Sequence, residues 1–195
     1  MNRKDIQVEN TGINRGVIIA ENTGNISLTL VETKKIPSLI SKIVQTLGTV
    51  CLDDEISNIN TLEVFKPDKK IEYNAVLRYR EIINEYSIYY DLCERYLNIY
   101  DNSNIRGKAK ILRCVKLWYS EEKGQMLEKF RKANLTEMDI IRENSDYIIE
   151  AVKKKILDTV IRDMNEDCYI EDLEIGVACF TCYCFMKCKI LEKPK

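Results

Sequence analysis

The fold is decided by residues 70–100, which read KIEYNAVLRYREIINEYSIYYDLCERYLNIY. Apolar side chains recur in this stretch at alternating steps of three and four residues. They are Val76, Tyr79, Ile83, Tyr86, Tyr90, Cys93, Leu97 and Tyr100. This spacing places them on one face of an α-helix through four heptads. A second apolar series beside the first widens that face, so we expect a helix that packs against at least two neighbours.

We therefore predict one uninterrupted helix from about residue 70 to residue 100. No Gly or Pro interrupts the stretch, and at about 1.5 Å per residue the helix would be roughly 45 Å long. The predicted fold class is mainly α. It is a helical bundle around this one long central helix, with a small β-hairpin arm at the N-terminus.

Residues 1–35 form the predicted arm, because their pattern is that of strands rather than of a helix. Two runs rich in β-branched residues, 17–20 (VIIA) and 26–31 (ISLTLV), flank an Asn-Thr-Gly-Asn turn. A lone hairpin is only marginally stable, so this one should pair with a partner chain or lie on the helices. The other interpretation is a partly disordered arm. The candidate partner interface consists of Val17, Ile18, Ile19, Ile26, Leu28 and Leu30.

Residues 36–195 are the predicted helical domain. Further helices are expected at about 36–47, ending at Gly48, at about 108–130, where Gly124 can introduce a kink, and at about 145–164. Thr136 and Asp139 have the spacing of a capping box. A last helix at about 170–189 is apolar on nearly all sides, which favours a central position.

The composition limits the classes of function. The chain has 195 residues, 45% of them hydrophobic, and a formal net charge of −1, so it can bury a core and is not a globally basic protein. It contains no histidine, which excludes a histidine base and any histidine-ligated metal site. Its first residues do not resemble a signal peptide, and its most apolar run, 175–186, is too short to span a bilayer. We therefore expect a cytoplasmic protein without a membrane partner; the sequence does not indicate its oligomeric state.

The charges are unevenly distributed along the chain. Residues 101–135 contain nine Lys or Arg and four Asp or Glu, whereas residues 136–175 contain five and twelve. Arg106, Lys110 and Arg113 share one helical face, and such a row can follow a phosphate backbone. The other interpretations are a solvated face and a face paired with the acidic segment.

Cysteines are the densest candidate metal ligands. Eight are present, and four of them follow the pattern Cys179-x-x-Cys182-x-Cys184-x-x-x-Cys188. On a helix the first two point away from the last two, and the residues between them provide no turn that would bring the thiols together. We therefore predict a buried Cys-rich helix rather than a zinc or iron–sulfur site, and expect no cofactor.

A third hypothesis concerns a metal-dependent nuclease. Glu32-Thr33-Lys34 ends a run of β-branched residues, and Glu21 precedes it. A carboxylate followed by Glu-x-Lys at a strand end can hold Mg²⁺ and polarise water. The competing interpretation is a solvated strand end that leads into a helix.

Five stretches together resemble a known family. They are the Asn/Gly-rich N-terminal strands, residues 69–74 (KKIEYN), 82–90 (IINEYSIYY), 108–112 (KAKIL) and 188–194 (CKILEKP). The chain resembles the helical modules of bacterial ABC-three-component conflict systems, including the small subunit of Lamassu-like antiphage operons. The resemblance covers most of residues 65–195.

The resemblance implies a non-enzymatic accessory subunit that binds an SMC-like ATPase or an effector and couples sensing to activation. It transfers no catalytic residue to this sequence. Nucleic acid would then be reached through the complex. The alternative is a helical protein that binds nucleic acid directly through the basic face at residues 106–116.

Overall fold

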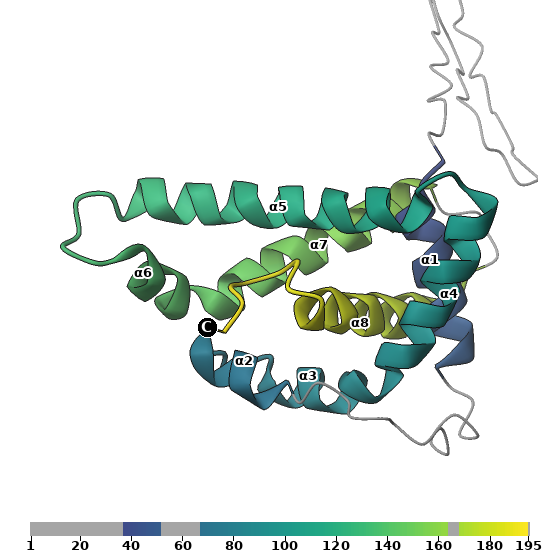
Figure 1. Cartoon of the computed structure of the whole chain (residues 1–195), viewed down its shortest axis with the longest axis horizontal. Helices are drawn as coiled ribbons and strands as arrows, with labels where there is room; N and C mark the ends of the chain where they lie inside the picture. Colours follow the sequence, from purple (N-terminus) through teal and green to yellow (C-terminus); the bar gives the residue numbers. More distant parts are fainter. Residues whose placement is uncertain (1–36, 52–66, 164–167, 195) are drawn as a thin grey trace, which may run out of the picture. The chain divides into compact units, whose positions relative to one another are not determined.

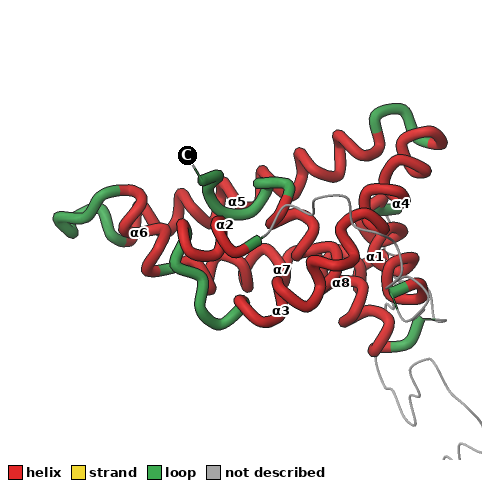
Figure 2. Tube along the Cα trace, turned by 60° about the horizontal axis from the view of Figure 1, so that its bottom comes forward, coloured by secondary structure: helices red, strands yellow, loops and turns green. Residues whose placement is uncertain are grey.

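A computed structural model of the chain describes residues 37–51, 67–163 and 168–194. These residues form a bundle of helices and contain no strand (Figure 2). The helices are α1 (Leu39–Val50), α2 (Asp68–Tyr73), α3 (Arg80–Tyr86), the 3₁₀ helix η2 (Ser87–Tyr89), α4 (Tyr90–Ser103), α5 (Gly107–Lys129), α6 (Glu137–Glu143), α7 (Ser145–Asp163) and α8 (Ile170–Met186). The predicted mainly α fold is thus confirmed. The chain divides into two units between residues 34 and 35, and all described residues belong to the second. The predicted hairpin arm lies outside the described residues.

Helix α8 is the centre of the bundle, as its apolar sequence predicts. It packs against α1, α3, η2, α4 and α7, and every residue from Cys179 to Met186 is buried. In Figure 1, α5 and α7 lie on one side of α8, and α2 and α3 lie on the other. A helix covered on so many sides has to be apolar around its whole circumference.

Helices α1 and α8 approach each other closely at two glycines. A Cβ atom on Gly48 would lie 2.0 Å from the carbonyl oxygen of Asp172, and one on Gly176 would lie 2.1 Å from that of Val44. Because α1 continues to Val50, the prediction that Gly48 ends the first helix is wrong. Gly48 is needed because a side chain there would force the two helices apart.

The prediction of one long helix from residue 70 to residue 100 is also wrong. The stretch forms α2, α3, η2 and α4 in succession, and Figure 1 shows α4 turning away from the direction of α3. The apolar stripe is nevertheless directed inward, because Val76, Ile83, Cys93 and Leu97 are all buried. The pattern identified the buried face correctly but not the continuity of the helix.

The first cause of the break is a contact with the C-terminal segment. The Asn74 side chain donates to the carbonyl oxygen of Glu192 (2.9 Å) and accepts from its backbone N–H (3.0 Å). Ala75 then takes a left-handed conformation with φ 52°, which costs a non-glycine residue about 1–2 kcal/mol. Nearby, the fully buried Lys70 donates to the carbonyl oxygen of Ile190 (2.7 Å), and burial lowers its pKa to about 8. These contacts end α2 and fix the C-terminal segment.

The second cause is a carboxylate at the start of α7. Asp146 accepts hydrogen bonds from the backbone N–H groups of Leu77 and Arg78, both at 3.1 Å, and of Tyr79 at 3.2 Å. These three residues form the turn directly before α3, whose N-cap residue is Tyr79. Asp146 thus fixes the turn that leads into α3 from 67 residues away in the chain.

Other boundaries agree more closely with the predictions. Thr136 and Asp139 form the predicted capping box at the start of α6, and α7 begins at Ser145. Helix α5 continues through Gly124 to Lys129. Helix α8 begins at Ile170 as predicted and ends at Met186, three residues before the expected end.

Candidate functional site

The outer face of α5 carries the basic row that the sequence predicts. Arg106 is the residue before the helix, and Lys110 and Arg113 follow at spacings of four and three residues. All three side chains are exposed. Because residues at these spacings share one side of a helix, the three charges form a line along α5, on the side opposite its buried residues such as Ile111 and Val115.

Among the described residues, these three cations have no acidic partner, in contrast to Lys108 and Lys123 of the same helix. In the described part of the chain, no ion pair or side-chain hydrogen bond is formed by Arg106, Lys110 or Arg113. The acidic segment at residues 136–175 pairs elsewhere, for example through Glu150 with Arg78. The interpretation that the basic row pairs with this acidic segment is therefore not supported for these three residues.

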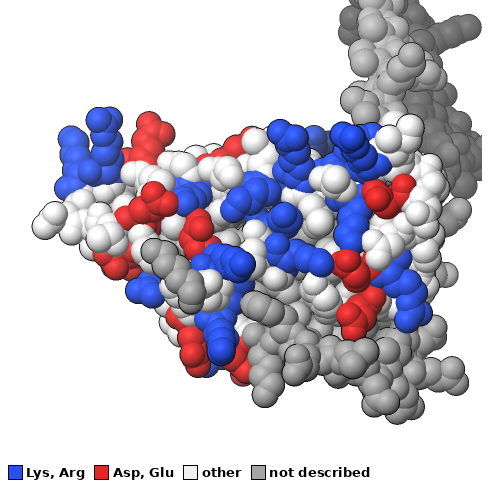
Figure 3. Space-filling view, in the orientation of Figure 1, with Lys and Arg blue, Asp and Glu red and all other residues white. Residues whose placement is uncertain are grey.

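Lys116 continues the basic row of α5 toward the C-terminal segment. Lys116 is half-buried, with its ammonium group 4.3 Å from the centre of the Tyr119 ring. Burial lowers the pKa of Lys116; the charge of Glu192 opposes this shift, and the charges of Lys123 and Lys189 add to it. Figure 3 shows Lys and Arg side chains gathered over α5 and beside it. No periodic signal predicts that Lys189, which follows α8, acts on Lys116 of α5.

Large apolar side chains are exposed at the same face. Leu117 follows Arg113 by four residues on the same line of α5 and is 57% exposed, and Ile105, just before the helix, is 85% exposed. Exposed apolar side chains among charges are common singly, but two beside a row of unpaired cations are typical of a contact surface. The sequence analysis did not identify either residue as part of a site.

The neighbouring lysines have structural roles. Glu94 of α4 accepts from the Tyr183 hydroxyl and from the ammonium groups of Lys108 and Lys187, the latter at 3.0 Å. Burial alone would raise the pKa of Glu94, but these hydrogen bonds lower it to about 2. Lys108 therefore joins α5 to α4 and belongs to the framework that positions the outer face.

A second carboxylate holds the middle of α5. Glu192 accepts from the Tyr119 hydroxyl (2.6 Å) and from the Lys123 ammonium group (2.8 Å). Burial acts to raise the pKa of Glu192, but the hydrogen bonds from Lys123 and Tyr119 lower it below its usual value. Glu94 thus holds the start of α5 and Glu192 holds its middle, and both contacts lie on the side away from the basic row.

The Cys-rich helix is buried, as predicted. Cys179, Cys182 and Cys184 are all inside the core, and the Cys179 sulfur lies 3.3 Å from that of Cys51 and 3.4 Å from that of Cys93. Burial raises the pKa of Cys93, as expected for thiols packed as small apolar groups. Among the described residues, no group of three or more Cys, Asp or Glu side chains is placed to hold a metal ion.

Two predicted sites lie outside the described residues. They are the hairpin interface, with Val17, Ile18, Ile19, Ile26, Leu28 and Leu30, and the nuclease residues Glu21, Glu32 and Lys34. Both stay predictions. In the described ranges, no helix has the length and apolar character needed to cross a bilayer. No family model, no curated protein and no solved structure matches this chain.

Proposed function

We propose that the protein is a non-enzymatic, protein-binding accessory subunit of an antiphage defence complex, which docks on an SMC-like ATPase or an effector. The proposal combines the resemblance of residues 65–195 with one observation. The outer face of α5 presents cations that have no acidic partner among the described residues, together with the exposed Leu117 and, just before the helix, the exposed Ile105.

The chemistry of this face fits an acidic protein surface that contains apolar side chains. Covering Leu117 and Ile105 removes apolar area from water, at about 25 cal/mol per Å². Carboxylates of the partner would approach Arg106, Lys110 and Arg113, which steers association and selects the partner. Arginine is also enriched where binding energy concentrates at protein interfaces. This combination supports docking of a protein more than contact with phosphates alone.

The contacts that hold α5 in place suit a subunit that couples sensing to activation. Glu94 and Glu192 tie α5 to α4 and to the C-terminal segment, and α5 packs against α7. A partner bound to such a rigid helix is held in one orientation relative to the rest of the subunit. An accessory subunit that transmits a sensing event needs this property, because a loose contact would not bias an ATPase toward one state.

The test is assembly with the companion ATPase. The full chain would be co-expressed with the SMC-like ATPase, and the affinity and ATP hydrolysis of the complex measured. We expect the double variant Ile105→Ser/Leu117→Ser to weaken binding at least tenfold without loss of helix content. The matched control is Ile161→Ser, which removes a side chain of similar exposure, 53%, from α7. Failure of the unaltered chain to bind, or equal binding by the double variant, would contradict the proposal.

A second candidate function is direct binding of nucleic acid by the same face. The specific observation in its favour is the exposed row Arg106, Lys110 and Arg113, which has no acidic partner among the described residues and is followed on α5 by Lys116. Cations in a line on one helix can follow a phosphate backbone, and each phosphate neutralised adds about −0.9 to the slope of log K against log salt.

The two candidates are separated by which side chains matter. If nucleic acid binds, replacing Arg106, Lys110 and Arg113 with Gln should reduce the salt slope for a 20-base-pair DNA duplex by about 3. Leu117→Ser should then have no effect. The control replaces Lys42, Arg80 and Lys154, which are equally exposed on other helices. Equal loss in both triple variants would show that only net charge matters.

A further inference from the structure

Three buried thiols meet where α1, α4 and α8 come together, and we call Cys51, Cys93 and Cys179 the thiol cluster. The Cys179 sulfur of α8 lies 3.3 Å from that of Cys51, which directly follows α1. It lies 3.4 Å from that of Cys93 in α4. Both distances are direct contacts between sulfur atoms. The Cys179 thiol therefore touches two possible bonding partners at once.

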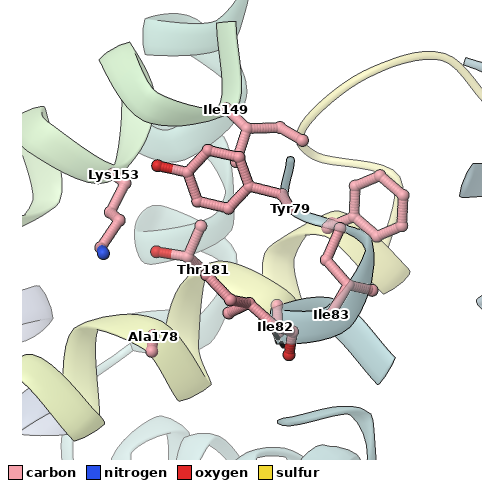
Figure 4. A pocket seen from close by; sticks show the side chains of 9 residues that line it. Tyr79, Ile82, Ile83, Ile149, Lys153, Ala178 and Thr181 are labelled. Carbon is pink, nitrogen blue, oxygen red and sulfur yellow. Dashed lines mark hydrogen bonds between the residues drawn. The ribbon is translucent and has the colours of Figure 1, made fainter. Parts of the chain in front are cut away.

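The thiol cluster differs from the side of α8 that packs toward α3 and α7. Figure 4 shows Ala178 and Thr181 on that side, where Cys182 also lies. The Cys182 thiol donates to the carbonyl oxygen of Ile82 (3.7 Å). Its contact is thus with a carbonyl group, whereas Cys179 contacts sulfur on two other elements. Only a contact between two thiols allows a disulfide bond to form.

Cys51 is the member of the thiol cluster that a reagent reaches first. It is 5% exposed, whereas Cys93 and Cys179 are 0% exposed. Its backbone N–H donates to the carbonyl oxygen of Leu47 (3.0 Å) at the end of α1, and helix ends open locally at a low free energy. The hydrogen bond to Cys179 and burial raise the pKa of Cys51. Thiolate is therefore scarce at neutral pH, and the reaction is slow.

We infer that the thiol cluster is a redox-modification site, at which the Cys179 sulfur forms a disulfide bond with Cys51 or, by exchange, with Cys93. The reagent is a small-molecule disulfide such as oxidised glutathione. The first bond ties α8 to the end of α1, and the second ties α8 to α4. Where thiols are kept reduced the cluster stays open, and it closes when the surroundings become oxidising. This chemistry does not depend on the proposed function.

The bond forms in two exchange steps. Opening at the end of α1 exposes Cys51, whose thiol loses its proton to solvent and attacks one sulfur of glutathione disulfide. The S–S bond breaks, and a glutathione thiolate leaves and takes up a proton. Cys179 then loses its proton, its sulfur attacks the Cys51 sulfur, and the second glutathione leaves in the same way. Two protein thiols are thus oxidised, and one glutathione disulfide is reduced to two glutathione thiols.

The test equilibrates the folded full chain with a series of glutathione redox buffers at about pH 8. Free thiols are then alkylated, and linked peptides are identified by mass spectrometry. We expect a Cys51–Cys179 link, with roughly fivefold less of any link that lacks Cys179. Cys51→Ala should shift the link to Cys93–Cys179, and Cys93→Ala should leave the first link in place. The matched control is Cys184→Ala, an equally buried thiol of α8, which should behave as the unaltered chain does.

Two results of this mapping would overturn the inference. One is that no buffer in the series gives a link to Cys179. The other is that Cys179→Ala retains the same amount of intramolecular disulfide as the unaltered chain. If Cys179→Ala does not fold, the double variant Cys51→Ala/Cys93→Ala removes both partners of Cys179 and takes its place in the comparison.

The stability of the oxidised chain provides a second measurement. Cys51 and Cys179 are 128 residues apart in the sequence, so a bond between them constrains the unfolded chain strongly. We expect unchanged helix content and a urea midpoint about 1 M higher than in the reduced chain. A lower midpoint would show that the two sulfur atoms cannot bond without distorting the core, and the thiol cluster would then not be a modification site.

Discussion

Helices α8 and α5 each contain a glycine, but the surroundings of the two glycines differ. Gly176 of α8 faces α1 so closely that a Cβ atom would lie 2.1 Å from a backbone oxygen, whereas no described residue lies within 4 Å of a Cβ atom on Gly124 of α5. The described residues enclose the C-terminal half of α8 but cover α5 on one side only. The difference teaches that the sequence of α8 is constrained by packing, whereas one side of α5 is free of such constraint from the described residues.

The largest expected effect comes from adding a methyl group at Gly176, which lies against α1. Gly176→Ala should destabilise the protein by about 3 kcal/mol, because backbone atoms of α1 cannot move aside as a flexible side chain would. The free energy of unfolding in urea measures the loss. Glu174→Ala, at an exposed position of α8, is the control and should stay within about 0.5 kcal/mol. A loss below about 1 kcal/mol would show that α1 and α8 are not in such close contact.

The next largest effect concerns α3, which packs against α8. Asp146→Ala removes the acceptor for three backbone N–H groups in the turn before α3. We expect a loss of about 2 kcal/mol, since these hydrogen bonds are made to a charged group, and increased hydrogen exchange in residues 77–83. Asp158→Ala on the same helix is the control. An unchanged exchange rate in residues 77–83 would contradict the role of Asp146 in holding this turn.

Asp146 also shows why the sequence predicts some features and not others. Periodicity identified the buried face of residues 70–100 because Val76, Ile83, Cys93 and Leu97 keep their register through the breaks. It could not show the breaks themselves, because they are imposed by Asp146 and Glu192, which are distant in the sequence. Local signals such as the Thr136 capping box were predicted correctly, since both partners are three residues apart.

The candidate site likewise contains features that local sequence signals predict and features that depend on residues distant in the sequence. The row Arg106, Lys110 and Arg113 follows from helical spacing, and its exposure agrees with that prediction. The effect of Lys189 on the Lys116 pKa, in contrast, requires two elements that meet only in the folded chain. Sequence reasoning therefore finds sites on one helix and misses those formed by several.

A third prediction uses the thiols that are enclosed in α8. Burial raises the pKa of Cys182 from 9.0 to about 12. A group whose pKa is higher in the folded state contributes stability below its unfolded pKa and loses it as the pH rises. From pH 9 to pH 10 and above, unfolded Cys182 ionises while the folded thiol does not, so stability falls. The lowered pKa of Lys70 acts in the opposite direction between pH 8 and pH 10.5.

The contribution of Cys182 ionisation to the pH dependence of stability is measured by comparing the protein with a variant that lacks this thiol. The stability difference between the unaltered protein and Cys182→Ala should shrink by about 1.4 kcal/mol between pH 7 and pH 10. Val177→Ala, a truncation in α8 that removes no titrating group, should give a difference that does not depend on pH. The measurement is the urea midpoint at each pH. If both variants respond alike, the Cys182 thiol is not protected from ionisation.

The smallest effect has the opposite sign and belongs to α5. Gly124→Ala should stabilise the protein by about 0.7 kcal/mol, because alanine loses less backbone entropy on folding into a helix and the added methyl group meets nothing. The same substitution that destabilises α8 thus strengthens α5. The urea midpoint should rise. A destabilising Gly124→Ala would mean that this side of α5 is already covered by another part of the chain, and the assignment of its outer face to a partner would then fail.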